Sequence, residues 1–544
     1  MTEEGKSEKK EHYLLSGLRP FRDSLYRLLW FATVFSYIGS AMYEVGASWL
    51  MASIAPNPLL VSLITTTSTL PIFLFAVPSG AVSDIFDRRK ILLITCGYMF
   101  VVSLILGIFT LLGITTPFLL LLFTFALGAG ITMIRTPILP AMSALVSKSD
   151  LPSALTLSAV ASNIGRAVGP TIGGLVVTLF APWAAFFLNS LSFIFMMGVI
   201  IRLPKKSKSS ALPPENIFGA IRAQLRYVRY SQAAVTLIVR SILFTFCSSP
   251  LLSLLPLLAK HEMHIDSAGF GLLLGSFGLG AIFGGIVVLP KLSGRFSIES
   301  FLTISIGVLS LVMFSVGFIR DFVILCAIMG IGGISYVTIL SKLYTVGMKS
   351  APSWIGSRVL AVYLLVLNGG LAVGSVIWGT TANIIGIPFT LSIASLFLGA
   401  TIIARRYYST DFINKLDFTP ASNDHWSLPS HLVVEPSNSG SQTLITIEYR
   451  IDTRLFVEFE QTVYELGRLL RSEGLAYWEL FQDPADVSHY VEIRIADTWT
   501  DHMRHHERVT KNVQSLENKI THLLKDGPKP VISHYLAKSD FIKK

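Results

Sequence analysis

Long apolar stretches alternate with short polar segments along most of the chain. A helix needs about 20 predominantly apolar residues to cross the hydrocarbon core of a bilayer, and twelve stretches come close to or exceed that length. The pattern predicts an all-α membrane protein with twelve transmembrane helices. The predicted spans are 28–52, 59–82, 91–113, 117–146, 155–180, 183–203, 233–258, 268–290, 299–319, 322–348, 357–383 and 387–405.

The pattern of polar and apolar residues changes after residue 405. Residues 406–441 contain Ser, Pro, Asn and Asp without periodicity, which predicts a linker. Residues 442–544 follow the order strand, helix, strand, strand, helix, strand, which predicts an α+β ferredoxin-like (βαββαβ) domain. The expected strands are 443–451, 475–481, 490–495 and 531–536, and the expected helices are 456–471 and 499–524, the second either continuous or broken near Val509.

Basic residues mark one side of the membrane. Cytoplasmic loops of membrane proteins carry an excess of Lys and Arg. Such residues gather in the N-terminal segment 1–27, in the loop after the second span, in the loop 204–232 and directly after the last span. We therefore predict that both termini are cytoplasmic, and that 28–203 and 233–405 are two six-helix halves joined by the basic loop 204–232.

The composition excludes several classes of protein. Only 14% of the residues are charged, against about 25% in soluble proteins, which excludes an ordinary soluble enzyme and a disordered chain. The net charge is +10, from 44 Lys and Arg against 34 Asp and Glu. The membrane surface accounts for this excess, so no nucleic-acid partner is expected. Cys96, Cys247 and Cys326 lie inside apolar stretches, and no disulfide framework is indicated.

The two predicted halves share sequence at an offset of 205 residues. The segment Asn163-Ile-Gly165-Arg-Ala-Val-Gly169 returns as Asn368-Gly-Gly370-Leu-Ala-Val-Gly374, and Gly80 falls on Gly285. Both matches place a span of the first half on the corresponding span of the second half. This arrangement predicts two parallel repeats, as in many secondary transporters.

Two motifs in the first half carry a family resemblance. The loop after the second span contains a glycine, two aspartates and a basic cluster, which are Gly80, Asp84, Asp87, Arg88, Arg89 and Lys90. Span five contains Gly169-Pro170 followed by Gly173-Gly174. With the twelve spans and the repeat, these motifs resemble the loop signature and the exporter-associated motif of the major facilitator superfamily. The stretches Ile134–Pro140 and Phe187–Phe193 are similar to its enterobactin-exporter-like branch, the transmembrane secretion effectors.

This resemblance implies a function. Members of the branch are secondary active transporters that work by alternating access and export small molecules such as siderophores and antibiotics. The implied location is the bacterial inner membrane, with a small-molecule substrate and the lipid bilayer as partners. The loop residues from Gly80 to Lys90 would form a cytoplasmic gate. The alternative is that Arg88, Arg89 and Lys90 only fix the topology.

The glycines of span five have a packing explanation. Gly165, Gly169 and Gly173 recur every fourth residue and share one helix face, where a second helix can approach closely. Pro170 removes one backbone hydrogen bond and can bend the helix. Gly370 and Gly374 repeat the pattern in span eleven. We expect these residues to pack helices rather than to contact substrate.

Three ionisable residues lie deep inside predicted spans, where charges are costly and mark functional positions. They are Glu44, Arg135 and Arg166. The resemblance places spans one, four, seven and ten along the central cavity, so Glu44 and Arg135 are expected to face it. A carboxyl group in a low-dielectric cavity can change between charged and neutral forms near neutral pH. Our hypothesis is that Glu44 carries a coupling proton and that Arg135 competes with it.

Two other roles for Glu44 and Arg135 stay open, which are direct contact with the substrate and a structural ion pair. The sequence contains no Gly-x4-Gly-Lys-Ser/Thr motif for nucleotide binding. We therefore expect no cofactor and a proton gradient as the energy source.

The C-terminal domain resembles the antibiotic-biosynthesis-monooxygenase type of dimeric α/β barrel. It shows no nucleophile constellation, so a regulatory or dimerising role, with a homodimer formed through this domain, is expected rather than catalysis. His502 and His506 lie one helical turn apart and could share a metal. A solvated or dimer-interface helix face is the preferred interpretation, with pH sensing as another alternative, and no metal site is predicted.

Alternatives to export of a siderophore or antibiotic also stay open. They are transport of a lysolipid or another amphiphile, fusion of a transporter to a cytoplasmic monooxygenase-like enzyme, and a sensor or scaffold that transports nothing. The sequence leaves the identity of the substrate open.

Overall fold

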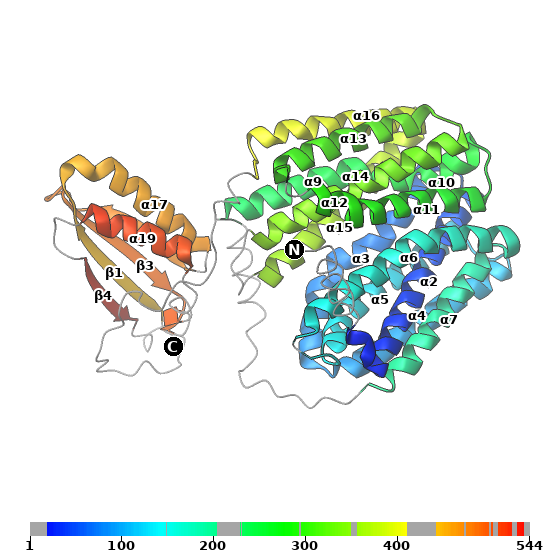
Figure 1. Ribbon diagram of the computed structural model, residues 1–544, viewed down its shortest axis with the longest axis horizontal. Coiled ribbons are helices and arrows are strands. Elements are labelled where there is room, and N and C mark those ends of the chain that lie inside the picture. Colours follow the sequence, from blue (N-terminus) through cyan, green and yellow to red (C-terminus); the bar gives the residue numbers. More distant parts are fainter. Residues whose placement is uncertain are drawn as a thin grey trace, which may run out of the picture. The chain divides into compact units, whose positions relative to one another are not determined.

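The computed structural model describes residues 19–147, 149–203, 229, 231–292, 295–349, 356–410, 442–472, 475–499, 502–503, 510–524 and 530–537. These residues form two compact units, a larger one made mostly of the long helices and a smaller one that contains a C-terminal sheet. Figure 1 shows the helices and the strands. Most of the N-terminal segment, the loop 204–232 and the linker 406–441 of the sequence analysis lie outside the described residues.

Twelve long helices follow one another in the described chain. The first half contains α2 (Ser24–Ile54), α3 (Pro58–Ile85), α4 (Arg88–Leu111), α5 (Pro117–Ser143), α6 (Leu151–Phe180) and α7 (Pro182–Ile200), preceded by the short η1 (Arg19–Arg22). The second half contains α9 (Gln232–Ser253), α11 (Ser267–Phe283), α13 (Ile298–Phe318), α14 (Phe322–Lys349), α15 (Gly356–Ile385) and α16 (Ile387–Ala400). Eleven helical stretches of the described residues are long and apolar enough to cross a membrane.

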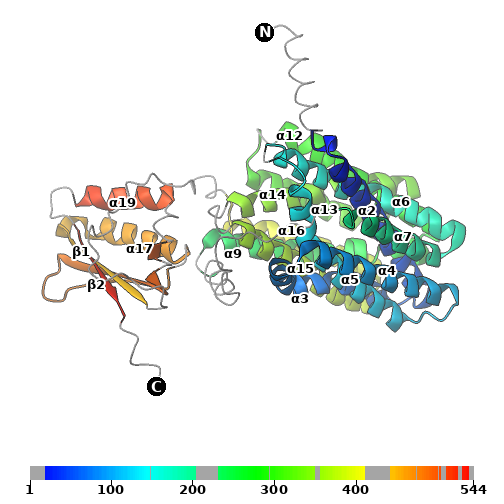
Figure 2. The same cartoon turned by 90° about the horizontal axis from the view of Figure 1, so that it is seen from below.

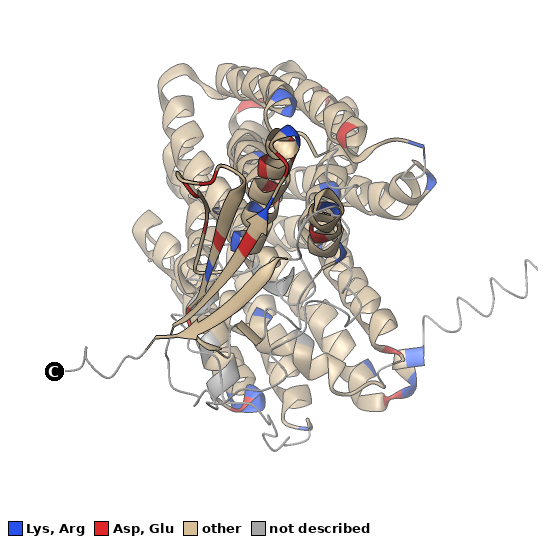
Figure 3. Cartoon of the chain, turned by 90° about the vertical axis from the view of Figure 1, so that its left-hand side faces the viewer, with Lys and Arg blue, Asp and Glu red and all other residues tan. Residues whose placement is uncertain are grey.

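The twelfth helix, α6, has 30 residues but lies outside that set. Its glycines, its serines and Arg166 make it less apolar than its neighbours. Most of the ribbon in Figure 3 is uncharged, as expected for helices surrounded by lipid. The prediction of a twelve-helix membrane protein is confirmed.

Two spans predicted as continuous helices contain irregular turns instead, and a third ends in one. The span predicted at 233–258 breaks after Ser253 and continues as α10 (Leu255–Leu257) and the π-turn η2 (Leu258–Glu262). Pro256 lies in the first turn of α10, where its missing N–H costs little. The eighth span contains the π-turn η3 (Gly284–Val288) and ends as α12 (Leu289–Leu292), and the last span ends in the 3₁₀ turn η4 (Thr401–Arg406).

Close helix contacts repeat at the offset found in the sequence. A Cβ atom on Gly165 of α6 would come within 2.5 Å of the Tyr37 Cβ of α2. In the second half, a Cβ atom on Gly370 of α15 would come within 3.4 Å of the Ile242 carbonyl oxygen of α9. Gly370 is Gly165 shifted by 205 residues, and Ile242 is Tyr37 shifted by 205 residues. The same relation holds between the contacts Gly169–Ala41 and Gly374–Phe246. The two halves are therefore structural repeats.

The C-terminal domain is a four-stranded antiparallel sheet with two helices on one face, as Figure 2 shows. Its elements are β1 (Thr443–Arg450), α17 (Phe456–Ser472), β2 (Tyr477–Gln482), β3 (His489–Ala496), α19 (Lys511–Leu523) and β4 (Val531–Leu536), and the strand order is β2-β3-β1-β4. Alternate residues of β1, such as Ile445, Ile447 and Tyr449, are buried against the helices. The predicted βαββαβ ferredoxin-like fold is confirmed.

Candidate functional site

The three ionisable residues predicted to lie deep in the membrane do lie far from the helix ends. Arg166 is in the middle of the 30-residue α6. At about 1.5 Å per residue, Glu44 lies about 15 Å before the end of α2 and Arg135 about 12 Å before the end of α5. All three side chains are exposed, although the residues next to Glu44, which are Tyr43 and Val45, are buried.

These three residues lie close enough for the charge of Glu44 to interact with both arginines. Side chains from α2, α5 and α6 therefore lie within electrostatic range of one another. The charge of Arg166 also reaches Tyr336 of α14, in the second half of the protein. Ionisable groups that act on one another across four helices and both halves are expected to lie inside the bundle, because lipid would not accommodate them.

Tyr336 was not predicted from the sequence. The sequence feature that could have indicated it is its position in span ten, one of the spans that the family resemblance places along the cavity. The sequence alone did not distinguish it from the many aromatic residues of the other spans.

The residues predicted to form the gate, at the junction of α3 and α4, differ in their contacts. The Asp87 carboxylate accepts a hydrogen bond from the Arg89 N–H at 2.8 Å and caps α4. The Arg89 guanidinium donates to the Ile201 carbonyl at the end of α7. Arg88 and Lys90 are exposed, and a Cβ atom on Gly80 would meet no other atom within 4 Å. Asp84 lies in the last turn of α3, and its side chain is outside the described set.

The glycines of α6 lie against two different helices. Gly165, Gly169 and Gly173 contact α2, where added Cβ atoms would come within 2.8 Å of Tyr37, Ala41 or Met42 atoms. The adjacent Gly174 contacts α11, where an added Cβ atom would come within 2.9 Å of the Gly271 Cα. The helix therefore binds its own half through one face and the second half through another. Pro170 belongs to this second contact, because its carbonyl oxygen faces Gly271.

A second inter-half contact repeats the first. Gly379 of α15 lies against α3, where an added Cβ atom would come within 2.9 Å of the Ser62 Cβ. Gly379 is Gly174 shifted by 205 residues, and Ser267, whose carbonyl faces Gly174, is Ser62 shifted by 205 residues. The sequence analysis missed Gly379, although the repeat would have indicated it.

Polar contacts reinforce both seams between the halves. Thr178 and Ser267 hydroxyls lie 2.6 Å apart, and the Thr66 hydroxyl donates to the Ala372 carbonyl at 3.0 Å. We call the end of the bundle with Arg88 to Lys90 and Arg405 to Arg406 the basic end, and the other end the opposite end. These seams run from the middle of the bundle toward the opposite end, because Phe180, Ser267 and Pro58 lie there.

The C-terminal domain encloses a buried network of charges. The Glu492 carboxylate, which has no exposed area, accepts hydrogen bonds from Tyr449 Oη at 2.6 Å, Trp478 Nε1 at 2.7 Å and Arg494 Nε at 2.6 Å. Arg494 Nη1 also lies 3.8 Å from Glu517 Oε1 of α19. Burial, together with the charge of Glu492, raises the pKa of Tyr449 well above its usual value, so the phenol stays a donor.

We expect Arg494→Met to destabilise the C-terminal domain. Glu492 and Glu517 are 0% and 3% exposed, and the change leaves both carboxylates without their guanidinium partner. Breaking a buried pair in this way costs about 3–5 kcal/mol. Urea unfolding of residues 440–544, followed by tryptophan fluorescence, measures the loss. The matched control is Arg454→Met, whose side chain is 88% exposed. A loss for Arg494→Met as small as that of the control contradicts the prediction.

One histidine of the pair considered in the sequence analysis, His502, is described by the structure, and it lies beside a histidine of another element. His502 is 5% exposed, and its ring centre lies 5.1 Å from that of His534 on β4 and 5.3 Å from that of Trp499. His506 lies outside the described residues. Burial lowers the pKa of His534. Among the described residues, no group of three or more His, Cys, Asp or Glu could hold a metal ion.

Comparisons with known proteins agree on a transporter fold. A bacterial homologue of the human lysosomal transporter Spinster, solved in an inward-facing and unoccupied conformation, is 14% identical, with a TM-score of 0.59, over 74% of this chain and 99% of that chain. A POT family transporter in complex with 5-aminolevulinic acid is 13% identical, with a TM-score of 0.57, over 71% of this chain and 96% of that chain.

Curated relatives match about two thirds of this chain. The Staphyloferrin A transporter of Staphylococcus aureus is 21% identical over 366 residues, 66% of this chain and 90% of that protein. Macrolide efflux protein A of Streptococcus pyogenes is 22% identical over 66% of this chain and 89% of that protein. The multidrug efflux pump Tap of Mycolicibacterium fortuitum is 24% identical over 69% of this chain and 94% of that protein. The model of the transmembrane secretion effectors matches residues 15–540, and the chain belongs to this family of the major facilitator superfamily.

Proposed function

We propose that the protein exports a small organic molecule across the bacterial cytoplasmic membrane by alternating access, with inward proton movement as the energy source. The observation that carries the proposal is the interaction of Glu44 with Arg135 and Arg166 in the interior of the bundle. Charged side chains within the membrane are costly, so a protein retains them where they bind a proton or a substrate. Glu44 is the acid that takes up and releases the proton, and Arg135 and Arg166 set its affinity for that proton.

The conformation supports alternating access. The seams made by Gly174 and Gly379 close the bundle toward the opposite end. The excess of Lys and Arg supports a cytoplasmic location for the basic end, so closed seams at the opposite end support an inward-facing state. A substrate enters from the cytoplasm in this state and leaves after the seams open. Movement of two rigid halves about a central site is the usual mechanism for repeat-built transporters.

The names of the relatives suggest which compounds to test. We propose a siderophore or an antibiotic as the substrate, because relatives carry the names Staphyloferrin A transporter and Macrolide efflux protein A. The experiment uses inside-out vesicles that are acidified inside by respiration, with staphyloferrin A or a macrolide added outside. We expect the substrate to dissipate the pH gradient in vesicles that contain the protein and not in empty vesicles. No dissipation with any compound contradicts proton-coupled export.

We propose that the C-terminal domain is a homodimerising module rather than an enzyme. The space between its sheet and helices is filled by Tyr449, Trp478 and Glu492, which leaves little room for a substrate. The other face of the sheet carries apolar side chains. They are Leu444, Tyr477, Phe481, Val491, Ile493, Ile495, Val531 and Tyr535. A second copy of the domain would cover this face, as in the dimeric barrels that the sequence resembles.

We expect Ile493→Lys to dissociate this dimer, because Ile493 lies on β3 between Thr446 and Glu479 near the middle of this face, and a lysine there replaces apolar contact area with a charge that must lose its water. Light scattering of residues 440–544 measures the mass of the wild type and of the variant. The matched control is Val457→Lys, a 70% exposed residue of α17 on the other side of the sheet. A monomeric wild type, or a dimeric Ile493→Lys variant, shows that this face does not join two copies.

A further inference from the structure

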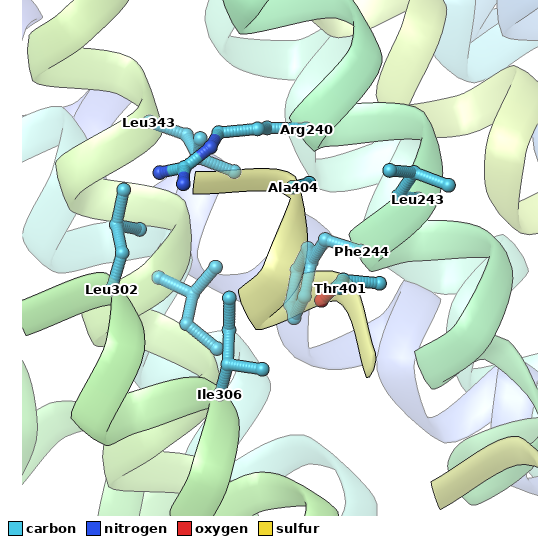
Figure 4. A pocket seen from close by; sticks show the side chains of 9 residues that line it. Arg240, Leu243, Phe244, Leu302, Ile306, Leu343, Thr401 and Ala404 are labelled. Atoms are coloured by element: carbon cyan, nitrogen blue, oxygen red, sulfur yellow. The ribbon is translucent and has the colours of Figure 1, made fainter. Parts of the chain in front are cut away.

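Span seven is held firmly within its own half of the protein. Arg240 of α9 donates two hydrogen bonds to Glu299 of α13, from Nη1 to Oε2 at 3.0 Å and from Nη2 to Oε1 at 2.6 Å. The side chains are 9% and 1% exposed. Figure 4 shows Arg240 reaching from α9 toward α13, which carries Leu302. Two parallel hydrogen bonds between guanidinium and carboxylate are strong and fixed in geometry, so α9 moves together with the second half.

The other end of this span reaches the first half. After α9 and α10, the π-turn η2 brings two consecutive residues, Lys260 and His261, against the end of α2. Lys260 Nζ donates a hydrogen bond to Ser53 Oγ, which in turn donates to the Trp49 carbonyl at 2.8 Å. The Lys260 ammonium also lies 5.4 Å from the centre of the Trp49 ring, within the range of a cation–π contact. A single lysine therefore contacts residues on two successive turns of α2.

The end of α2 is suited to accept such a contact. In a continuing helix the Ala52 carbonyl would bond to the N–H four residues later, but Pro56 has no N–H. His261 Nε2 lies 3.4 Å from this carbonyl oxygen and can donate to it. The C-terminus of a helix also carries a partial negative charge, which a cation stabilises. Among the described residues no carboxylate forms an ion pair with Lys260, so its partners are the dipoles of α2 and not another charge.

This contact is not a consequence of the internal repeat. Shifted by 205 residues, Ser53 corresponds to Leu258 and Lys260 corresponds to Ala55. The equivalent position therefore carries two apolar side chains, which cannot form a hydrogen bond with each other. The glycine seams occur twice, once for each half, whereas the contact between Lys260 and Ser53 occurs once. It adds to the closed opposite end an interaction that the symmetric packing does not supply.

We propose that Lys260 and His261 form a latch, which holds the end of α2 while the opposite end is closed and releases it when that end opens. The latch rests on the alternating access proposed above. Its bonds are single and partly exposed to water, so they break more easily than the buried ion pair between Arg240 and Glu299. Each half therefore moves as one body, and the latch is a point at which the two bodies separate.

The latch is connected to the proposed proton site through α2. Glu44 lies on this helix about 13.5 Å before Ser53, at 1.5 Å of rise per residue. A helix is stiff over this distance, so release of its end lets Glu44 move relative to the second half. Lys260 is therefore a positioning residue of the transport cycle and does not contact the substrate or the proton.

The test measures how readily the opposite end opens in the purified full chain, held in lipid nanodiscs without substrate or a pH gradient. The reporter is Ser267→Cys in a chain whose three native cysteines are replaced by alanine. Ser267 is 3% exposed in the closed seam, so the rate at which the new thiol reacts with a maleimide reports opening. Lys260→Met keeps the apolar part of the side chain but removes the ammonium, and we expect labelling at least about fivefold faster. Lys260→Arg keeps the charge and is expected to label like the wild type.

Two further variants separate the latch from a general effect of charge. Ser53→Ala removes the acceptor and is expected to speed labelling, and its combination with Lys260→Met should label no faster than Lys260→Met, because both changes remove the same hydrogen bond. The matched control is Arg320→Gln, which removes another cation at this end. Arg320 bonds within its own half, to Glu262 and to the Val316 carbonyl, so this variant is expected to label like the wild type.

Labelling of Lys260→Met at the rate of the wild type, or an equal acceleration in Arg320→Gln, overturns the latch. The measurement needs neither a substrate nor a proton gradient. Faster labelling of Lys260→Met with normal labelling of Lys260→Arg therefore supports the latch even if the vesicles show no export, so the failure of one proposal is distinguishable from the failure of the other.

Discussion

Glu44→Gln is expected to abolish proton-coupled transport in the inside-out vesicles. Glutamine keeps the shape of the side chain but cannot take up or release a proton. The charges of Arg135 and Arg166 then lose the carboxylate with which they interact. We expect the rate at which substrate dissipates the pH gradient to fall at least about tenfold, which corresponds to at least about 1.4 kcal/mol. What remains of transport should not depend on pH.

The control for this variant is Glu262→Gln. Glu262 lies in η2 at the opposite end of the bundle and forms a half-exposed ion pair with Arg320 at 3.2 Å. Exposed pairs of this kind contribute little to stability, so transport should be close to that of the wild type. If Glu44→Gln transports with the pH dependence of the wild type, Glu44 does not carry the proton. A variant that binds substrate normally but does not transport would keep the coupling role and exclude direct substrate contact.

Gly174→Leu is expected to disturb the seam between the halves and to slow transport. An added Cβ atom would meet the Ser267 carbonyl oxygen and come within 2.9 Å of the Gly271 Cα. Both obstacles are backbone atoms, which cannot move aside like a flexible side chain. Overpacking of this kind costs about 1–3 kcal/mol. A conformational equilibrium biased by that amount shifts about 5- to 150-fold toward the state in which the seam is open.

A cysteine at position 267 reports this shift. Ser267 is 3% exposed and lies against Thr178 in the closed seam, so Ser267→Cys should react with a membrane-impermeant maleimide only when the seam opens. The background replaces Cys96, Cys247 and Cys326 with alanine. We expect faster labelling and slower transport in Gly174→Leu, and the same for Gly379→Leu at the equivalent position. Gly307→Leu on α13 is the control, because a Cβ atom there meets no atom within 4 Å. Labelling and transport like those of the wild type in Gly174→Leu would show that the seam does not close this end.

The twelve helices and the order of the C-terminal elements were predictable because each rests on a local pattern. An apolar stretch near 20 residues long predicts a span wherever it occurs. The last strand, Val531–Leu536, was predicted with the bounds that the structure gives it. The breaks at Leu254 and Gly284 were not predicted, because hydropathy does not distinguish an α-helix from a π-turn. Prolines and glycines near these breaks were the available signal.

The candidate site was predictable only in part. Glu44, Arg135 and Arg166 stood out because ionisable residues are rare in apolar spans. The prediction that they share one environment depended on a family resemblance, since spacing along the chain does not show which helices meet. The pair His502 and His506 was proposed from helical spacing, yet the imidazole beside His502 in the described chain belongs to His534 on a distant strand.

The sequence by itself determined the membrane architecture, the two repeated halves, the basic end and the fold of the C-terminal domain. These properties depend on periodicity, length and charge, which are read along the chain. Only the tertiary structure decided which residues interact across it: Arg166 with Tyr336 through its charge, Gly379 with Ser62, and Arg240 with Glu299. Contacts between distant segments depend on helix rotation and packing, because a rotation of one residue, about 100°, turns a side chain from the cavity toward a neighbouring helix.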